Sequence, residues 1–581
     1  MAVTTGAPPG LAPSRVAEAA DAGFRLRSCV QDVPRAVWAV TALFASLLLA
    51  YAVLLPVYRA PDEPEHVQSV LDLERGRGWA APGTDLLDPA VVASLRVSGL
   101  SPSANVLDRS RLPYHAKAAP ARGDRGSFDT LWQPGGPPQV NQLTQHPPLY
   151  YAVQAAALRL SGGTSWAYDR AVLLLRLLSA LMVLPLPLLA YAAARRLRGP
   201  GPVAVTAAVL PLAVPQLLHI GASVNNDDLL IPLVGALTVA LAFVVTGDLS
   251  RRTAVWVGGL TALALLTKGF AFILPVWIGL TYTVALLRYR RRAALGAGAV
   301  ALAVATLLGG GWWLGNVLRY GALQPGGELI PPAQPGFVPD LSALLGEYGD
   351  HLAERFWGSF GWFDVAVPDL ATALATAVLL VGVLLALLGP GRLAVDRWLV
   401  LTAPLVGLVL LVMLLTRRTY LASGQFRGLQ GRYFLPAVVA VAVLVAVGLG
   451  GLLRRSARWL PLACALLAGV MQLVAVRTIL NGFWRPVGDG SSYRSALHAL
   501  LAWSAWPQAV TVTALVAPLV LGLLALTDLA RPAGTSAAAG QPVPSPAEDA
   551  GGQQRRATLA EVLAHQAQVA GHPADTRPRM S

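Results

Sequence analysis

A succession of apolar segments, each about as long as a membrane helix, most limits what this chain can fold into. A helix needs roughly 20 mostly apolar residues to cross a bilayer. Only 13% of the 581 residues are charged, against about 25% in a soluble globular protein. The sequence therefore predicts an all-α polytopic membrane protein. We predict about twelve transmembrane helices, at 35–57, 168–194, 201–219, 229–247, 254–267, 270–287, 293–315, 370–389, 398–415, 435–453, 459–480 and 508–528.

The composition excludes several other classes of protein. A hydrophobic content of 55% is too high for a disordered chain. Two cysteines far apart, Cys29 and Cys464, do not make a disulfide scaffold. A net charge of +14 would suit a nucleic-acid-binding protein, but the basic residues lie in short clusters between apolar spans. That distribution is typical of a membrane protein, and we expect no nucleic-acid partner.

The arginine clusters predict the orientation of the spans. Short loops on the cytoplasmic side carry an excess of Lys and Arg. With a cytoplasmic N-terminus, five clustered loops all fall inside. We therefore expect a multi-pass protein of the bacterial plasma membrane with both termini in the cytoplasm. The clusters are Arg195, Arg196 and Arg198; Arg251 and Arg252; Arg288 and Arg290 to Arg292; Arg392 and Arg397; and Arg454, Arg455 and Arg458.

Composition also predicts the domain boundaries. Residues 1–34 and 530–581 are rich in Ala, Pro and Gly, and we expect both to be disordered cytoplasmic tails. Between them, 35–529 forms one transmembrane domain. Its long outer loops are 58–167 and 316–369, and they hold most of the unexpected polar residues.

Two features of the spans leave alternatives open. Residues 254–287 form either one long helix or two helices broken at Thr267, Lys268 and Gly269. Two helices are preferred, because one span would place the arginines of 288–292 outside. Residues 50–52 weakly resemble a signal-peptide cleavage site, so processing of the first span stays open.

The first outer loop opens with a carboxylate motif, Pro61-Asp62-Glu63-Pro64-Glu65-His66. Asp62 followed by Glu65 fits a helix N-cap with its capping-box partner. The apolar residues that follow predict a helix lying along the membrane surface. Alternatively, Asp62 is a carboxylate held at the lipid–water boundary, where it accepts a proton from a hydroxyl group. The two interpretations are compatible.

The same loop ends with His146-Pro147-Pro148, and apolar residues at helical spacing predict a second surface helix from 149 to 160. Counting this stretch as a span would reverse the arginine pattern. His146 either makes a hydrogen bond at the helix entry or binds a phosphate or acceptor group, because anions are favoured at helix N-termini.

Asn226, Asp227 and Asp228 lie between two apolar spans. Carboxylates there are costly unless they are solvated or used. They form either a solvated turn with a helix cap, or hydrogen bonds to substrate hydroxyls or a cation. Two adjacent aspartates are weak evidence for a metal, so we assign no metal ligands and leave a divalent cation open as a cofactor.

Residues 416–436 run against the charge bias, because they place arginines outside, including Arg427 and Arg432. A guanidinium holds phosphate through paired hydrogen bonds, which suggests an anionic partner. The alternative is contact with lipid headgroups. The aromatic stretch with Trp357 and Trp362 fits either a membrane-interface belt or a platform for a sugar ring or lipid tail.

Taken in order, these motifs resemble those of the integral-membrane GT-C glycosyltransferases, and within them the protein O-mannosyltransferase and aminoarabinose-transferase branch. The chain also resembles a bacterial family of membrane proteins with a Pro-Asp-Glu-Pro-x-His motif. The resemblance covers about 35–530. It is carried by 61–64, 146–148, 226–227, 267–268, 356–362 and 430–433.

The resemblance implies a GT-C-like fold and an inverting transfer of sugar from a polyprenyl-phosphate donor. The acceptor would be a glycan, lipid or protein at the outer face. Asp62 would be the general base, and Lys268 and Arg432 would hold the donor phosphate. Arg427 and Tyr433 would assist them, and the remaining pocket residues would be Glu63, His66, His146, Asn226, Asp227, Asp228, Trp357 and Trp362. Glu63 is followed by Pro64 and Glu65, unlike the simpler Asp-Glu runs of the mannosyltransferases, so the acceptor stays open.

Two other functions remain. A transporter or flippase of lipid-linked sugars would place ionisable groups and broken helices near the middle of the bilayer. We find no internal repeat, although Pro185, Pro187, Pro211 and Pro215 lie in spans. A non-catalytic protein of envelope assembly would use Asp62 only as a helix cap.

Overall fold

The computed structural model describes residues 32–100, 114–132, 140–199, 201–326, 331–485 and 492–531. Helices dominate these residues, and the named strands among them are β1 (Ser359–Phe360) and β2 (Val365–Ala366), paired antiparallel. The predicted tails lie almost wholly outside the described residues, so their disorder and their side of the membrane stay predictions.

Nine helical segments of the described chain are long and apolar enough to cross a membrane. The first is α3 (Arg35–Leu54), and α7 (Tyr168–Val183) continues into α8 (Leu186–Arg198) as the second. The others are α11 (Asp227–Val245), η6 with α13 (Gly269–Phe272, Ile273–Tyr289), α17 (Asp369–Leu388), α18 (Val395–Ser423), η7 with α19 (Gly431–Ala437, Val438–Leu452), η8, α20 and η9 (Arg454–Trp459, Leu460–Ile479, Leu480–Trp484), and α22 (Gln508–Ala530).

Two bent pairs raise the number of spans in this part of the chain to as many as eleven. In one, α9 and η5 (Pro202–Val209, Leu210–Ala213) meet α10 (Pro215–Gly221) at 68°. In the other, α14 (Ala293–Gly309) meets α15 (Gly311–Tyr320) at 55°. This agrees with the prediction of an all-α polytopic membrane protein with about twelve spans. The remaining predicted span, 254–267, is α12 (Arg251–Leu265), whose 15 residues are short for a bilayer.

The predicted helix break is confirmed. Helix α12 ends at Leu265 and η6 begins at Gly269. Lys268 between them has an extended backbone, with φ −158° and ψ 147°, which cannot continue a helix. The chain therefore places the lysine in a gap between two helices.

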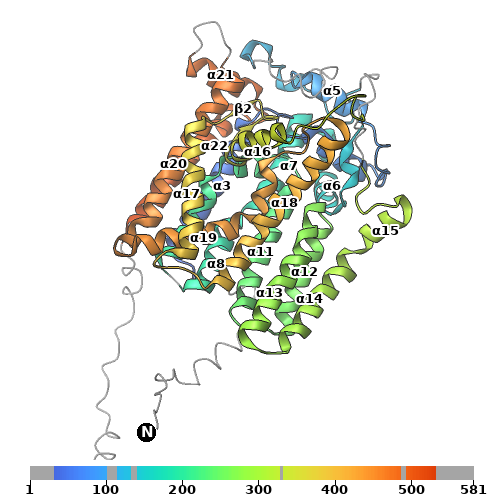
Figure 1. The fold of residues 1–581 in the computed structure, drawn as a ribbon. Coiled ribbons are helices and arrows are strands. Elements are labelled where there is room, and N and C mark those ends of the chain that lie inside the picture. Colours follow the sequence, from blue (N-terminus) through green and yellow to red (C-terminus); the bar gives the residue numbers. More distant parts are fainter. Residues whose placement is uncertain are drawn as a thin grey trace, which may run out of the picture. The chain divides into compact units, whose positions relative to one another are not determined.

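The segments that the sequence predicts to lie outside the membrane form short helices at one end of the bundle (Figure 1). Those of the first loop are α4 (Glu63–Glu74), α5 (Pro89–Val97), η1 (Ala116–Ala118), η2 (Arg122–Asp124), η3 (Gln142–Gln145), α6 (Leu149–Ser161) and η4 (Gly163–Ser165). Those of the later loops are α16 (Leu341–Trp357) and α21 (Tyr493–Trp503).

The two helices predicted in the first loop are present, but only α6 has an exposed apolar face, with Val153 and Leu160. Every residue from Glu63 to Asp72 in α4 is buried. Its apolar residues pack on protein, because α5, α6 and η3 surround the helix, and its position along the membrane surface stays a prediction.

Two arginines, Arg122 and Arg125, connect the first loop to the end of α21 by hydrogen bonds to carbonyl oxygens of residues 501–506. Arg125 is buried in an ion pair with Asp169, and it also donates to the carbonyl oxygens of Ala502, Trp503 and Ser504. Arg122 donates to Leu501, Ser504 and Trp506 oxygens. These bonds satisfy carbonyls that the end of a helix leaves unpaired.

Close contact between glycines and backbone joins α17 to the central helix α19. A Cβ on Gly448 of α19 would lie 2.0 Å from the carbonyl oxygen of Gly382 and 2.9 Å from the nitrogen of Ala386, both in α17. Small residues let membrane helices approach closely, which matters because lipid tails provide no hydrophobic drive for helix association. Gly448 therefore sets the spacing of these helices.

We expect Gly448→Ala to destabilise the protein by about 1–3 kcal/mol, because backbone atoms of α17 cannot move aside as a side chain can. Thermal unfolding in detergent measures the effect. Gly469→Ala in α20 is the control, because a Cβ there meets nothing within 4 Å. Equal stability of the two variants would contradict the packing role of Gly448.

Candidate functional site

Asp62 lies between α3 and α4, and its carboxylate is bound by an arginine far along the chain. Its Oδ2 accepts a hydrogen bond from Arg432 at 2.7 Å, and both side chains are buried. Gln142 Nε2 donates to the other carboxylate oxygen at 3.4 Å. The pairing of residues 62 and 432 brings the start of the first outer loop to the start of η7.

The prediction that the Asp62 side chain caps α4 is wrong. Asp62 is the N-cap residue by position, but its side chain makes no capping hydrogen bond. Its backbone has φ 60° and ψ 14°, in the left-handed region, whereas a capping side chain needs an extended backbone. A non-glycine residue in this region carries strain of about 1–3 kcal/mol, and such residues cluster at functional sites.

A second ion pair lies next to the first. Lys268 Nζ is 2.7 Å from Asp227 Oδ1, and both side chains are buried. The ring of Tyr433 lies under both cations, 5.2 Å from Lys268 Nζ and 5.4 Å from the guanidinium carbon of Arg432. We refer to Asp62, Asp227, Lys268 and Arg432 as the charged cluster.

The sequence positions the members of the charged cluster at helix ends. Asp62 precedes α4, Asp227 begins α11, Lys268 lies in the gap after α12, and Arg432 lies in the first turn of η7. Gly431 permits the last of these placements, because a Cβ there would lie 2.2 Å from the backbone nitrogen of Phe356 in α16.

The turn before α11 is buried, with Asn225, Asn226, Asp227 and Asp228 at most 1% exposed. The prediction of a solvated turn is therefore wrong, because protein encloses it. Asn225 Oδ1 caps the helix by accepting from the Asp227 backbone N–H at 2.9 Å. Within the described residues, both polar atoms of the Asn226 side chain and Oδ2 of Asp227 have no hydrogen-bond partner. Such atoms are rare in folded proteins, so they point to a missing ligand or water.

Two buried histidines, His66 and His146, lie close enough to Lys268 and Arg432 to be affected by their positive charge. Burial lowers the pKa of His66 well below its usual value, and Lys268 and Arg432 lower it further. The same causes lower the pKa of His146 to about 3. Both rings are therefore neutral near pH 7. His66 Nδ1 bonds to the Tyr151 hydroxyl at 3.0 Å.

His146 does not make the predicted hydrogen bond at the entry of α6. The N-cap of that helix is Pro148. His146 Nδ1 is buried without a partner among the residues that the structure describes.

Glu63 is held by a residue that the sequence analysis missed. Arg176 of α7 donates from Nε to Glu63 Oε1 and from a terminal nitrogen to Oε2, each at 2.7 Å. The sequence does contain a signal for Arg176, because this residue lies inside the predicted span 168–194. An ionisable residue within a membrane span suggests a function. The assignment of Glu63 to a substrate pocket stays a prediction.

Three other predicted site residues, Trp357, Trp362 and Arg427, make hydrogen bonds to residues outside the charged cluster. Trp357 is buried and donates to Thr376 Oγ1 at 2.8 Å, which packs α16 on α17. The Trp362 backbone donates to Asp364 Oδ1 at 3.0 Å. Arg427 Nε donates to Gln425 Oε1 at 2.6 Å. None of these bonds joins the charged cluster, and the three assignments remain predictions.

The acidic, histidine and cysteine side chains of the described ranges form no cluster that could bind a metal ion. No group of three or more His, Cys, Asp or Glu residues there could hold a metal ion.

Comparison with known proteins identifies the family. A family described as "Predicted membrane protein (DUF2142)" matches residues 45–441. No curated protein matches the chain.

Solved structures are similar at low identity. ArnT from Cupriavidus metallidurans bound to undecaprenyl phosphate is 15% identical, over 85% of this chain and 74% of that chain, with a TM-score of 0.44. Its apo form is 16% identical, over 85% and 76%, with a TM-score of 0.43. The apo oligosaccharyltransferase of Archaeoglobus fulgidus is 15% identical, over 85% and 56%, with a TM-score of 0.34.

We expect acid to destabilise the protein through His146. The unfolded chain binds a proton near pH 6.5, whereas the folded ring stays neutral until about pH 3. The free energy of unfolding therefore falls between these values, by up to about 1.4 kcal/mol per pH unit. Melting temperatures from pH 7 to pH 4 should show a shallower slope for His146→Gln. His498→Gln, on an exposed part of α21, is the control. An unchanged slope in His146→Gln would contradict the burial argument.

Proposed function

The chain belongs to the DUF2142 family of predicted membrane proteins, and we propose that it is a membrane glycosyltransferase. It would move a sugar from a polyprenyl-phosphate donor to a hydroxyl of a glycan, lipid or protein on the outer face of the membrane. The observation that carries this proposal is the charged cluster. It combines a buried carboxylate that can accept a proton with two buried cations that can hold a phosphate.

In this reaction, Asp62 takes the proton of the acceptor hydroxyl, and the acceptor oxygen bonds to the anomeric carbon. The bond from that carbon to the phosphate oxygen breaks, and its electron pair leaves with the polyprenyl phosphate. Attack opposite the leaving group inverts the anomeric centre. Arg432 and Lys268 stabilise the negative charge on the departing phosphate.

Polar atoms without a partner in and beside the charged cluster suit a sugar. The Asn226 amide and Asp227 Oδ2 offer unused hydrogen-bonding atoms. His146 adds a neutral ring nitrogen without a partner among the described residues. A sugar ring presents several hydroxyls, each both donor and acceptor, and it can satisfy such a set without adding charge.

The position of the cluster separates this proposal from a transporter. Transporters bind substrate near the middle of the bilayer, at broken helices. The helices bent at 68° and 55° would fit that arrangement. All four members of the charged cluster, however, lie at or next to the ends of helical segments, and Asp227 and Arg432 stand in the first turn of their spans. The placement favours chemistry at the membrane boundary.

We expect Asp62→Asn to lower sugar transfer about 10²- to 10⁴-fold, because an amide cannot accept the proton. Transfer is measured in membranes with a panel of polyprenyl-phosphate sugars, at matched protein levels. Asp350→Asn, in an exposed part of α16, is the control and should keep full transfer. Full transfer by Asp62→Asn would remove the general base and with it the proposed mechanism.

We expect changes of the two cations to act on the donor. Arg432→Gln and Lys268→Met should each raise the donor KM at least about 10-fold, since a charge-assisted hydrogen bond contributes about 1.5–3 kcal/mol. Lys268→Met is combined with Asp227→Asn so that no unpaired carboxylate stays buried. Arg288→Gln, in an ion pair with Asp396 elsewhere, is the control. Intact transfer with both cations replaced would refute the phosphate assignment.

A further inference from the structure

We infer that the Glu63–Arg176 ion pair is a positioning device that holds Asp62 and Asp227 in their reactive arrangement. The inference rests on the proposed function, because it assigns a role relative to the charged cluster. The pair is Glu63 and Arg176. Within the described residues, neither side chain makes a hydrogen bond or ion pair with Lys268 or Arg432. Five hydrogen bonds between this pair and backbone groups support the inference.

The pair itself is rigid. Two parallel hydrogen bonds of 2.7 Å join the guanidinium to the carboxylate. Their side chains are 2% and 0% exposed, respectively. A bidentate pair fixes the relative orientation of its two planes, in addition to their distance.

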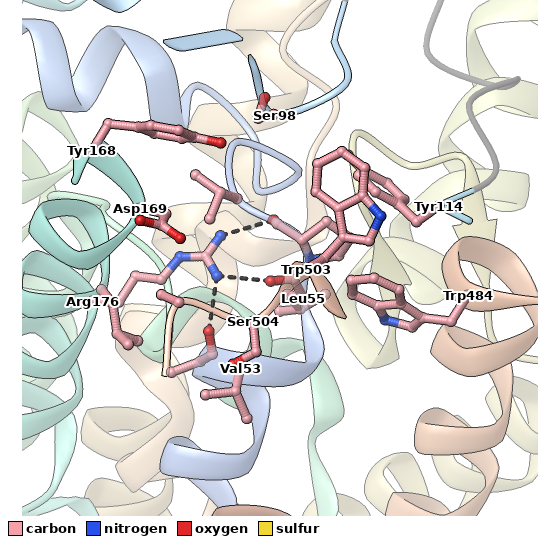
Figure 2. A pocket seen from close by; sticks show the side chains of 15 residues that line it. Val53, Leu55, Ser98, Tyr114, Tyr168, Asp169, Arg176, Trp484, Trp503 and Ser504 are labelled. Carbon is pink, nitrogen blue, oxygen red and sulfur yellow. Dashed lines mark hydrogen bonds between the residues drawn. The ribbon is translucent and has the colours of Figure 1, made fainter. Parts of the chain in front are cut away.

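Arg176 also holds the end of α3. One terminal nitrogen donates to the carbonyl oxygens of Ala52 and Leu55 at 2.9 and 2.8 Å, and the other donates to Pro56 at 2.9 Å. Figure 2 shows these three bonds at the edge of a pocket that Arg176 lines together with the end of α3. The last carbonyls of a helix lack partners within it, so the arginine caps α3 just before the chain reaches Asp62.

These contacts leave Arg176 no donor for a substrate. A guanidinium has five N–H groups. The structure gives Arg176 five hydrogen bonds, two to Glu63 and three to carbonyl oxygens. Arg176 lines the pocket in Figure 2, but its polar atoms face protein partners. It is therefore a positioning residue and not a phosphate-binding one.

Glu63 extends the device to a third segment. It accepts from the Tyr58 backbone N–H at 2.8 Å and from the Val224 backbone N–H at 3.1 Å. Val224 lies in the turn that leads to Asp227. One ion pair thus joins the end of α3, the start of α4 and the turn before α11, and the last two carry the acidic members of the charged cluster.

The strained backbone of Asp62 explains why such a device is needed. A left-handed non-glycine residue persists only where its surroundings hold it. Glu63 is the next residue, and its carboxylate is bound on three sides. Fixing Glu63 fixes the peptide that follows Asp62, and this directs the Asp62 carboxylate at Arg432.

The test separates positioning from general stability. We measure kcat and donor KM per folded, monodisperse protein for Glu63→Gln and Arg176→Lys. Both should lower kcat about 10- to 100-fold and change the donor KM less than about threefold, since the phosphate contacts are intact. Arg176→Lys keeps the charge but supplies only three donors.

Hydrogen exchange is the second readout and does not depend on transfer. In both variants, amide exchange should rise in residues 52–66 and 222–228. The control is Arg125→Lys with Asp169→Asn, a pair whose side chains are equally buried, 2% and 4% exposed. The control should raise exchange near η2 and α21, lower the melting temperature, and leave kcat within about twofold.

The outcomes are distinguishable. An unchanged kcat together with unchanged exchange in 52–66 and 222–228 would overturn the positioning role, as would an equal loss of kcat in the control pair. If Asp62→Asn retains transfer, the proposed function fails instead, and exchange still tests the device. If Arg176→Lys does not fold, the near-isosteric Glu63→Gln carries the test.

Discussion

Burial of charge is the constraint on which the rest of this structure depends. Taking an ion out of water costs several kcal/mol, and a buried ion persists when a partner and further hydrogen bonds compensate. In three buried ion pairs at and beside the candidate site, the compensating partner is distant in the chain. Asp62 pairs with Arg432, Asp227 with Lys268, and Glu63 with Arg176. Each pair therefore requires the spans to be assembled correctly before its charges can be buried.

The helix ends make this pairing achievable. A carboxylate in the middle of a span would face neighbouring apolar side chains, whereas helix ends offer polar backbone and changes of direction. The extended backbone at Lys268 and the left-handed backbone at Asp62 are two such changes. The glycine at 431 adds a close approach of η7 to α16. The charged cluster is therefore a product of how helices begin and end.

The local parts of this structure could be predicted from the sequence, and the non-local parts could not. Hydropathy located eleven of the predicted spans and the helix break at Lys268, because both depend on neighbouring residues. Asp62, Lys268 and Arg432 were also selected as unexpected polar residues, and the structure brings them together. The partner of each charge was not predicted, because pairing depends on tertiary packing. The same reason explains the errors on the Asp62 cap and the solvated turn.

Charge balance in the cluster suggests how a donor would change the chemistry of Asp62. Two carboxylates and two cations make the charged cluster neutral overall. While Arg432 is bound to Asp62, it occupies one oxygen of the carboxylate that would accept the proton. A phosphate drawn to Arg432 competes for the same N–H groups and adds negative charge beside Asp62. Under the proposed function, donor binding would therefore release the Asp62 carboxylate from Arg432 before an acceptor hydroxyl arrives. A site arranged in this way is unreactive toward acceptors until the donor is in place, because the carboxylate that would accept the proton stays paired with Arg432.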